Sequence, residues 1–238
     1  MKVVVLTTES LHHAFFVREI GMRYPLASVL LETAHSHPPF ETRHEFEAVR
    51  DEYEKEVWFN NKHSRIEDFA TTHNYPKINA SGCVSFLKAL APDVVLVFGT
   101  SKLSEEVIAA CPQGILNLHG GNPEEYRGLD SHLWAIYHGD FDNLVTTLHR
   151  VNPTLDDGDI VSMARLPIHH GMELYELRRW NTEICVRLAV QALDSFSQYG
   201  NVLSRPQNRK GRYYSSFPAA LKHLCVQKFH LHSASLPQ

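Results

Sequence analysis

Short apolar runs alternate with helical segments along the first half of the chain, and this alternation restricts the fold most strongly. The runs are apolar on nearly every residue rather than on every second one, so each predicted strand must be buried on both faces. Strands of that kind, separated by helices, form a parallel sheet with helices on both sides. We therefore predict an α/β fold with a Rossmann-like, mostly parallel and twisted sheet. The expected elements here are strands at Lys2–Leu6, Ala27–Leu31, Asp93–Phe98 and Gly114–Leu118 and helices at Leu11–Met22, Ser81–Leu90 and Glu105–Ala110.

The connection after the second strand is unusually long and forms an insertion over residues 33–75. Within it Phe46, Val49, Tyr53 and Val57 recur at helical spacing with charged residues between them. That pattern predicts an amphipathic helix of about four turns, so the insertion is expected to be mostly helical. Packing against the core is the simpler interpretation of this helix, and a lid over a nearby site is the alternative. A short strand is expected next, at Lys77–Asn79.

The second half of the chain continues with two strands around a loop, a long helix and a short final helix. These elements are predicted at Leu144–Arg150, Ile160–Leu166, Met172–Phe196 and Ala219–Val226. A basic, turn-rich segment changes the composition from Ser204 onward. The expected organisation is one domain over residues 1–200 followed by a short C-terminal extension over residues 201–238.

Composition argues against several classes of function. The formal net charge is −4 and no long run of lysine and arginine occurs, so no nucleic-acid partner is expected. The 4 cysteines lie far apart and the 16 histidines are dispersed, so we expect neither a disulfide framework nor a metal site. No apolar stretch approaches the roughly 20 residues of a membrane span, and the first apolar run is too short for a signal peptide. The expectation is a cytoplasmic protein without a membrane partner.

The chemistry-bearing residues gather where the strand at Gly114–Leu118 ends. Side chains two residues apart on a strand point to the same side, so Asn117 and His119 are expected to converge on one small volume. An amide donor and an imidazole in that arrangement suit stabilisation of an oxyanion together with a proton transfer. A carboxylate from a separate loop would fix the imidazole tautomer and raise its pKa. The competing interpretation is that Asn117 caps the turn and His119 is an ordinary loop histidine.

Three short motifs follow one another through the middle of the chain. They are Asn117-Leu118-His119, Pro123 followed by Tyr126-Arg127-Gly128, and Leu155-Asp156-Asp157-Gly158. Together they resemble the folate-dependent formyltransferase family, which includes methionyl-tRNA formyltransferase and glycinamide ribonucleotide transformylase. The resemblance extends from about Lys77 to Ile168 and more weakly back to Met1. It implies the formyltransferase version of the predicted fold and 10-formyltetrahydrofolate as the co-substrate.

By the same resemblance, Asn117, His119 and Asp156 are the catalytic residues. An amine would attack the formyl carbon, and Asn117 together with protonated His119 would stabilise the resulting oxyanion. Asp156 would orient His119 and help to move protons from the amine towards the departing folate nitrogen.

The remaining candidate site residues lie at the strand ends and within these motifs. For the folate they are Phe98, Gly99, Thr100, Leu155 and Asp157, and for the acceptor they are His12, Asn79, Gly120, Tyr126, Arg127 and Tyr213. Many family members carry Ser-Leu-Leu-Pro after the histidine, whereas this chain has Gly120-Gly121-Asn122-Pro123. Because glycine lets the backbone approach a ligand, the acceptor side of the pocket is expected to be altered.

The organisation is most similar to that of sugar-nucleotide N-formyltransferases of bacterial surface polysaccharide synthesis, including lipopolysaccharide and O-antigen. Only about forty residues follow the long helix and the chain is acidic, so an RNA acceptor is not expected. In a sugar-nucleotide enzyme Tyr213, Tyr214 and Phe217 would stack a base, and Arg209 or Arg212 would meet a pyrophosphate. Packing of these aromatics onto the core is the alternative.

Other functions stay open at this point. The acceptor could instead be another small amine, similar to glycinamide ribonucleotide or an amino acid. A 10-formyltetrahydrofolate hydrolase would carry the same three catalytic residues, and a non-catalytic folate-binding or partner-binding module is a third alternative. The insertion and the C-terminal extension are candidate contacts of a homodimer.

Overall fold

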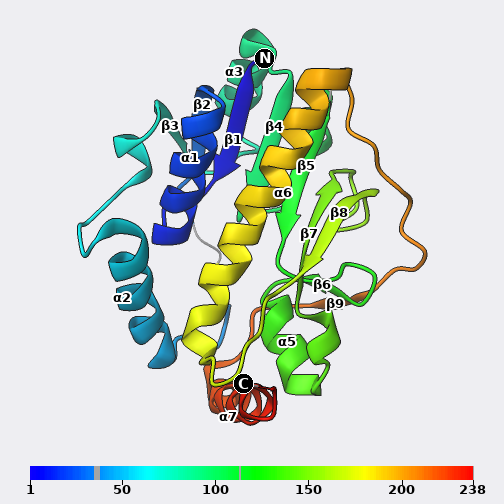
Figure 1. The fold of residues 1–238 in the computed structure, drawn as a ribbon. Coiled ribbons are helices and arrows are strands. Elements are labelled where there is room, and N and C mark those ends of the chain that lie inside the picture. Colours follow the sequence, from blue (N-terminus) through cyan, green and yellow to red (C-terminus); the bar gives the residue numbers. More distant parts are fainter. Residues whose placement is uncertain (35–37, 113, 238) are drawn as a thin grey trace.

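The computed structural model describes residues 1–34, 38–112 and 114–237 (Figure 1). Residues 35–37 of the predicted insertion therefore lie outside the described part of the chain. No helix in the described residues is both long enough and apolar enough to cross a membrane.

A seven-stranded sheet forms the centre of the described structure, in the order β3-β2-β1-β4-β5-β7-β8. The first five strands of the chain run parallel, whereas β7 is antiparallel to β5 and β8 is antiparallel to β7. This confirms the predicted α/β fold with a mostly parallel sheet. The strands are β1 (Val3–Thr7), β2 (Leu26–Glu32), β3 (Thr72–Tyr75), β4 (Val94–Phe98), β5 (Ile115–His119), β7 (Val145–Arg150) and β8 (Ile160–Arg165).

Helices cover both faces of the sheet, as Figure 1 shows. Val3 and Val5 of β1 belong to the core cluster that contains α1 and α6, whereas Val4 and Leu6 belong to the cluster with α3 and α4. Such alternation explains why the strand sequence is apolar throughout, since both faces are buried. The helices are α1 (Leu11–Arg23), α2 (Phe46–Phe59), α3 (Ser81–Leu90), α4 (Glu105–Ala109), α5 (Ser131–His138), α6 (Leu177–Tyr199) and α7 (Ala219–Ala234).

The strand order reverses beside β1, which pairs with β2 on one side and with β4 on the other. Ligands of open α/β sheets bind outside the carboxyl ends of the strands at such a reversal. The helix α1 begins just after β1, where the Ser10 hydroxyl accepts a hydrogen bond from the His13 N–H and caps its first turn. This edge of the sheet therefore brings together the ends of β1, β4 and β5.

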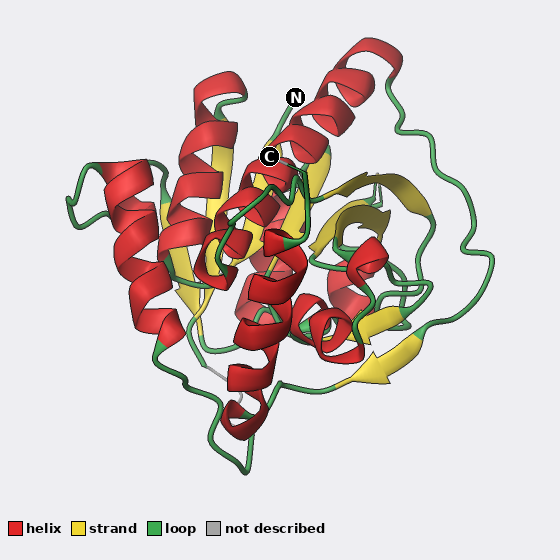
Figure 2. Cartoon of the chain, turned by 60° about the horizontal axis from the view of Figure 1, so that its bottom comes forward, coloured by secondary structure: helices red, strands yellow, loops and turns green. Residues whose placement is uncertain are grey.

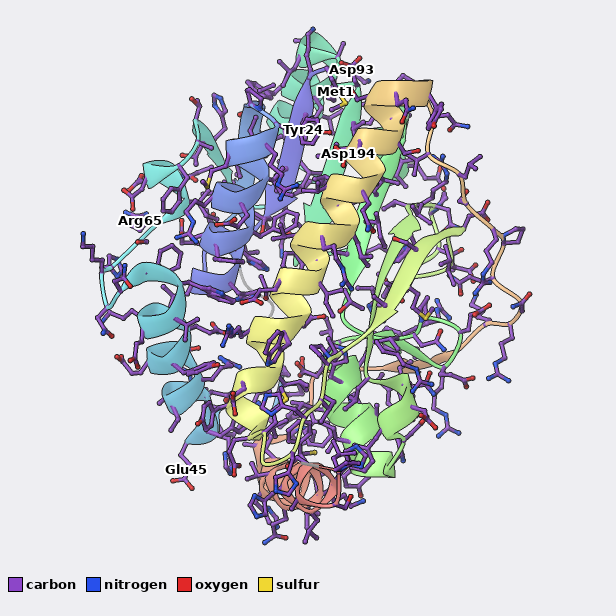
Figure 3. The ribbon with its side chains drawn as sticks, in the orientation of Figure 1. Met1, Tyr24, Glu45, Arg65, Asp93 and Asp194 are labelled. Carbon is purple, nitrogen blue, oxygen red and sulfur yellow. The ribbon has the colours of Figure 1, made fainter. Side chains whose placement is uncertain are left out.

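Helices α1 and α6 pack side by side across one face of the sheet. At their far ends, away from the carboxyl ends of the strands, Tyr24 donates a hydrogen bond to Asp194 (Figure 3). That hydrogen bond, followed by burial, raises the pKa of Tyr24 to about 12. The contact fixes the two helices together on the side opposite the site.

The C-terminal residues are packed into the main core rather than lying on its surface. Strand β9 (Arg212–Tyr214) pairs in parallel with β6 (Tyr126–Gly128), and the two form a small second sheet (Figure 2). Phe217 and Phe229 are fully buried in the cluster that also contains α1 and α6. The division into a domain over residues 1–200 and an extension over residues 201–238 stays a prediction.

Several elements differ from the sequence-based predictions. The third strand lies at Thr72–Tyr75, and Lys77–Asn79 forms a turn instead. The predicted apolar face of α2 is only partly right, because Phe46 and Tyr53 are half-buried but Val49 and Val57 are exposed. Glu54, Trp58 and Phe59 are buried instead. The long helix α6 starts at Leu177, after a short 3-10 turn at Leu174–Glu176.

Candidate active site

Asn117 and His119 lie on the same face of β5, near its carboxyl end. The antiparallel pairing of β5 with β7 places Asn117 directly opposite His149. The amide nitrogen of Asn117 lies 3.0 Å from His149 Nε2. His149 Nδ1 lies 2.8 Å from the Arg150 carbonyl oxygen, which can only accept, so Nδ1 carries the ring proton. In neutral His149, Nε2 therefore accepts from Asn117 and fixes the orientation of that amide.

His119 is buried, and its ring is held in one tautomer. Its Nε2 donates to the Tyr126 carbonyl oxygen at 2.8 Å, because that oxygen can only accept. The lone pair of neutral His119 is therefore on Nδ1, the atom 3.9 Å from Asp156 Oδ2. Burial lowers the pKa of His119, and the opposing charge of Asp156 offsets this only in part. Asp156 therefore raises the pKa of His119, as expected, but burial lowers it by more, and the Tyr126 carbonyl rather than the carboxylate fixes the tautomer.

Asp156 projects from the loop between β7 and β8 towards both histidines. Its Oδ2 accepts from the Gly128 N–H at 2.8 Å, and its Oδ1 lies 3.5 Å from His149 Nε2. Burial raises the pKa of Asp156, but the charges of His119 and His149 and these hydrogen bonds outweigh it and lower the pKa to about 2. Asp156 is therefore a carboxylate across the ordinary pH range and can stabilise a positive charge that appears on His119.

A cavity of about 670 Å³ opens at this edge of the sheet and contains the candidate catalytic residues in its wall. Such a volume is typical of small-molecule sites. On the β4 side, the predicted folate residues Phe98, Gly99, Thr100 and Leu155 line it. The predicted acceptor residues His12 of α1, Gly120 after β5 and Tyr213 of β9 line it as well. Their binding roles stay predictions.

The sequence model of the formyl transferase family matches residues 49–193, which contain Asn117, His119, His149 and Asp156. The chain belongs to the formyl transferase family.

A methionyl-tRNA formyltransferase from Porphyromonas gingivalis is 30% identical to this chain over 142 residues, 60% of this chain and 43% of the relative. The aligned region thus spans less than half of that relative. A sugar N-formyltransferase from a Shewanella species superimposes with a TM-score of 0.64 at 14% identity, over 100% of this chain and 89% of that one. The formyltransferase PseJ from Anoxybacillus kamchatkensis gives a TM-score of 0.57 at 16% identity, over 99% and 100% of the two chains. At these identities the two structures share the fold.

Two residues of the Tyr126-Arg127-Gly128 motif, Tyr126 and Arg127, were both predicted to bind the acceptor and do not line the cavity. Tyr126 is buried, donates from its hydroxyl to Asp140 and supplies the carbonyl that orients His119. Arg127 donates from Nε at 3.0 Å to the carbonyl oxygen of Leu155, and so shapes the loop that carries Asp156. The Tyr126 backbone and the Arg127 side chain thus support His119 and the loop of Asp156, and neither Tyr126 nor Arg127 lines the cavity.

The placement of Asp157 and Asn79 also corrects the sequence-based prediction. Asp157 does not line the cavity, and its carboxylate lies 3.9 Å from Lys210 Nζ. Asn79 lies outside the main cavity, where its side chain bonds to the Lys102 carbonyl and the Ser104 N–H and braces the loop after β4.

The two predicted pyrophosphate ligands lie elsewhere as well. Arg209 forms an ion pair with Glu125, and neither Arg209 nor Arg212 lines the cavity. Among the aromatics, Phe217 is fully buried, and Tyr214 stacks on Tyr126 with ring centroids 5.4 Å apart. Only Tyr213 of this group lines the cavity, with 56% of its surface exposed.

The glycine pair that follows His119 serves two different purposes. A Cβ on Gly121 would lie 2.7 Å from the Ser131 Cβ and 3.0 Å from His119 Nε2, so only glycine allows α5 to pack against the catalytic histidine. Gly120 lines the cavity, where a Cβ would lie 3.2 Å from the His132 ring. The first glycine therefore shapes the pocket, and the second is required by packing.

Sequence reasoning missed His149, which lines the cavity together with His13. The strand that contains His149 was predicted, but its antiparallel pairing with β5 was not, and that pairing puts His149 beside Asn117. His13 is buried against Phe98, with ring centroids 4.6 Å apart. In the described residues no group of three or more His, Cys, Asp or Glu side chains is arranged to bind a metal ion.

Proposed function

We propose that this chain transfers a formyl group from 10-formyltetrahydrofolate to the primary amine of a nucleotide-linked amino sugar, as in surface polysaccharide synthesis. The formyl-transfer part rests on one observation, the convergence of Asn117, His119 and Asp156 in the cavity wall. An amide donor, an imidazole with a free lone pair and a fixed carboxylate are the groups that acyl transfer to an amine requires.

Proton transfer in this mechanism begins at His119. The amine nitrogen attacks the formyl carbon, and the carbonyl oxygen gains negative charge. One amide proton of Asn117 is engaged by His149, which leaves the other available to stabilise that oxygen. The lone pair on His119 Nδ1 takes the proton that the amine loses, and Asp156 stabilises the resulting imidazolium.

The imidazolium then returns its proton to N10 of the folate as the carbon–nitrogen bond breaks. The products are the formamide and tetrahydrofolate, so atoms and protons balance. His119 acts first as a base and then as an acid, which its lowered pKa and the adjacent carboxylate both support.

The wall of the cavity on the β4 side suits the folate. Val97, Phe98 and Leu103 supply apolar surface, and the loop at residues 151–155 supplies backbone polar groups beside it. A flat heterocycle with polar edges fits a site of this composition. The structure of PseJ holds tetrahydrofolate and a formylated UDP-sugar, which supports the same pair of substrates here.

Another part of the cavity wall supports the sugar-nucleotide acceptor. Tyr213 lines the mouth of the cavity together with Leu129, whose surface is 52% exposed. Exposed aromatic and aliphatic side chains at a cavity mouth are suited to contact a nucleotide base or sugar. The likeness to a sugar N-formyltransferase over the whole chain supports the same acceptor class.

The test is a panel of amino sugar nucleotides offered with 10-formyltetrahydrofolate, with product mass as the readout. We expect a gain of one formyl group on at least one sugar nucleotide. Asn117→Ala should lower kcat by about 100- to 1000-fold, the usual cost of one oxyanion donor. Asn74→Ala, on exposed β3, is the matched control and should behave like the unmodified protein.

The alternatives give different outcomes in the same assay. Rapid formate release without any acceptor would indicate a hydrolase. Formylation of an amino acid or a nucleotide amine, with every sugar nucleotide untouched, would replace the proposed acceptor. Folate binding without turnover on any amine would indicate a binding module.

A further inference from the structure

Helix α2 of the insertion is joined to α6 by a buried ionic network. The carboxylate of Glu54 is buried and accepts two hydrogen bonds from Arg178, at 2.7 Å from Nε and 2.5 Å from Nη2. Asp51 accepts from Arg178 Nη2 at 2.8 Å and from Arg50 Nε and Nη2 at 3.0 and 2.9 Å. These contacts fix α2 against the cavity, where Phe46 and Arg50 of the helix line the wall.

Arg50 retains hydrogen-bonding capacity after these contacts. Its Nη1 makes no hydrogen bond in the described residues, and the nearest carboxylate oxygen, Oε1 of Glu47, is 3.8 Å away. Glu47 is itself engaged by Lys222 Nζ at 2.7 Å. The Arg50 side chain is only 17% exposed, so water solvates it poorly. The structure thus presents a guanidinium edge, fixed by Asp51, at the cavity wall.

Charges of both signs surround that edge, because Asp51 pairs with both Arg50 and Arg178 and Glu54 pairs with Arg178. Burial lowers the pKa of Arg50 and Arg178 lowers it further, whereas Asp51 and Glu54 raise it. His12, on the first turn of α1, has its pKa lowered by burial and by His13, with smaller contributions from both arginines. The amino end of α1 adds the positive end of a helix dipole. An anion bound here would give Arg50 Nη1 the hydrogen-bond partner that it lacks in the described residues.

Two lysines also line the cavity, and their contacts differ from those of Arg50. Lys77 Nζ lies 3.4 Å from the buried carboxylate of Glu32 and donates to the Ala34 carbonyl. Lys102 follows the folate candidates Phe98, Gly99 and Thr100 in the chain and also lines the cavity, so it is the candidate partner of the folate glutamate. Arg50 belongs instead to the insertion, which Glu54 and Arg178 join to α6.

We propose that Arg50, with Arg178 beside it, binds an anionic phosphate or diphosphate group of the acceptor, so that the insertion carries acceptor specificity. This inference deepens the proposed function and rests on it for the identity of the acceptor. A planar guanidinium suits two phosphate oxygens at once, and Asp51 already orients it for that role.

The experiment compares Arg50→Gln, Arg50→Lys and the control Arg65→Gln. Arg65 lies on the outer side of the insertion, where Figure 3 labels it, and its side chain is 52% exposed. Arg50→Gln should raise KM for the sugar nucleotide by about 10- to 100-fold, the usual effect of losing a charged hydrogen bond. KM for 10-formyltetrahydrofolate and kcat should change less than about threefold. Arg50→Lys should recover part of the loss, and Arg65→Gln should match the unmodified protein.

The substrate whose KM rises in Arg50→Gln is the one whose anionic group binds Arg50. A rise in KM for the folate, with KM for the acceptor unchanged, would assign Arg50 to the folate glutamate and overturn the proposal. A free amino sugar with the same amine should react equally with Arg50→Gln and the unmodified protein. Unequal rates on that phosphate-free acceptor would also overturn it, because they would show a structural effect.

Inorganic pyrophosphate separates this inference from the proposed function. It should raise the unfolding temperature of the unmodified protein and of Arg65→Gln, and raise it much less in Arg50→Gln. Equal stabilisation of all three would overturn the Arg50 site even if sugar nucleotides are substrates. Arg50-dependent stabilisation without formylation of any sugar nucleotide would keep the anion site and reject the acceptor. The unfolding temperature without ligand shows whether each variant is folded. If Arg50→Gln is not folded, the same comparison is made with Arg50→Lys.

Discussion

At the scale of single residues, the protonation of His119 governs the proposed chemistry. Its Nε2 proton is committed to the Tyr126 carbonyl, so only Nδ1 can exchange a proton with substrate. Burial keeps the neutral base form available below pH 6.5, and Asp156 limits how far the pKa falls. Burial and the Asp156 carboxylate therefore shift the pKa of His119 in opposite directions.

Changing Asp156 should shift the pH dependence of the reaction. If neutral His119 is the base, kcat/KM falls as the pH drops through the His119 pKa. Asp156 raises that pKa, so Asp156→Asn should move the acidic limb to lower pH, with kcat reduced by about 100-fold because the imidazolium loses its counter-ion. A pH profile of kcat/KM is the measurement. Asp157→Asn should leave the limb in place, and an upward shift in Asp156→Asn would contradict the assignment.

His149 should act as a positioning residue for Asn117. His149→Phe removes the acceptor of the Asn117 amide hydrogen bond, so kcat should fall by about 10- to 100-fold, in line with one lost buried hydrogen bond. Both KM values should change little, and His149→Gln, which keeps an acceptor, should recover part of kcat. Steady-state kinetics with each substrate varied will check this. A large rise in either KM instead would mean that His149 contacts a substrate.

At the scale of elements, the junction of α2 with α6 joins the insertion to the sheet. Glu54 is fully buried, and Arg178 depends on it and on Asp51 for neutralisation. Burial raises the pKa of Glu54, and Arg178 opposes that effect. The position of Arg50 in the cavity therefore depends on an ion pair one helical turn away.

Removing Glu54 should loosen this junction. Glu54→Ala leaves Arg178 partly buried without its main partner, which should lower the free energy of unfolding by about 3 kcal/mol. Urea denaturation measures the difference. Glu52→Ala, with a side chain that is 75% exposed, is the control and should change the value by less than about 0.5 kcal/mol. Equal effects of the two substitutions would show that the buried pair contributes little.

The elements that sequence reasoning predicted are those whose burial fixes their composition. β1 and β4 are apolar on both faces, and that pattern has few other interpretations. β3 has the sequence Thr-His-Asn-Tyr and lies at the sheet edge, half exposed, so no apolar run marks it. The buried face of α2 contains Glu54, and a charged residue does not register in a hydrophobic pattern, so that face could not be recognised from the sequence.

The same distinction applies to the site. Asn117 and His119 follow from strand alternation, which is local, and Asp156 followed from the family motif. His149 depends on a pairing between strands about thirty residues apart, and Arg50 on the docking of an insertion. Neither contact has a local sequence signal.

At the scale of the whole molecule, the C-terminal residues complete the core. Phe217 and Phe229 are fully buried, and β9 is the hydrogen-bonded partner of β6. A Cβ at Gly128 would lie 2.1 Å from the Tyr214 carbonyl oxygen, so the two strands meet at a contact that admits only glycine. The catalytic region and the C-terminal segment are therefore one packing unit.

Removal of residues 201–238 should consequently prevent cooperative folding rather than yield a smaller active domain. Exposing two buried phenylalanines alone costs about 3 to 5 kcal/mol each, comparable with the whole stability of many domains. Circular dichroism during thermal unfolding is the measurement, with the full chain as the reference. A truncated chain with a sharp transition and catalytic activity would support independent domains instead.

The parallel pairing of β6 with β9 also sets an order of events during synthesis. The Tyr126 carbonyl that orients His119 belongs to β6, and β6 has no strand partner until residues 212–214 have emerged from the ribosome. We expect a nascent chain stalled near residue 205 to carry Asn117, His119 and Asp156 outside the exit tunnel and yet to be inactive. Release of the remaining residues should then switch activity on in a single step, so that no unfinished chain consumes folate. Activity of stalled and released chains would test this order directly.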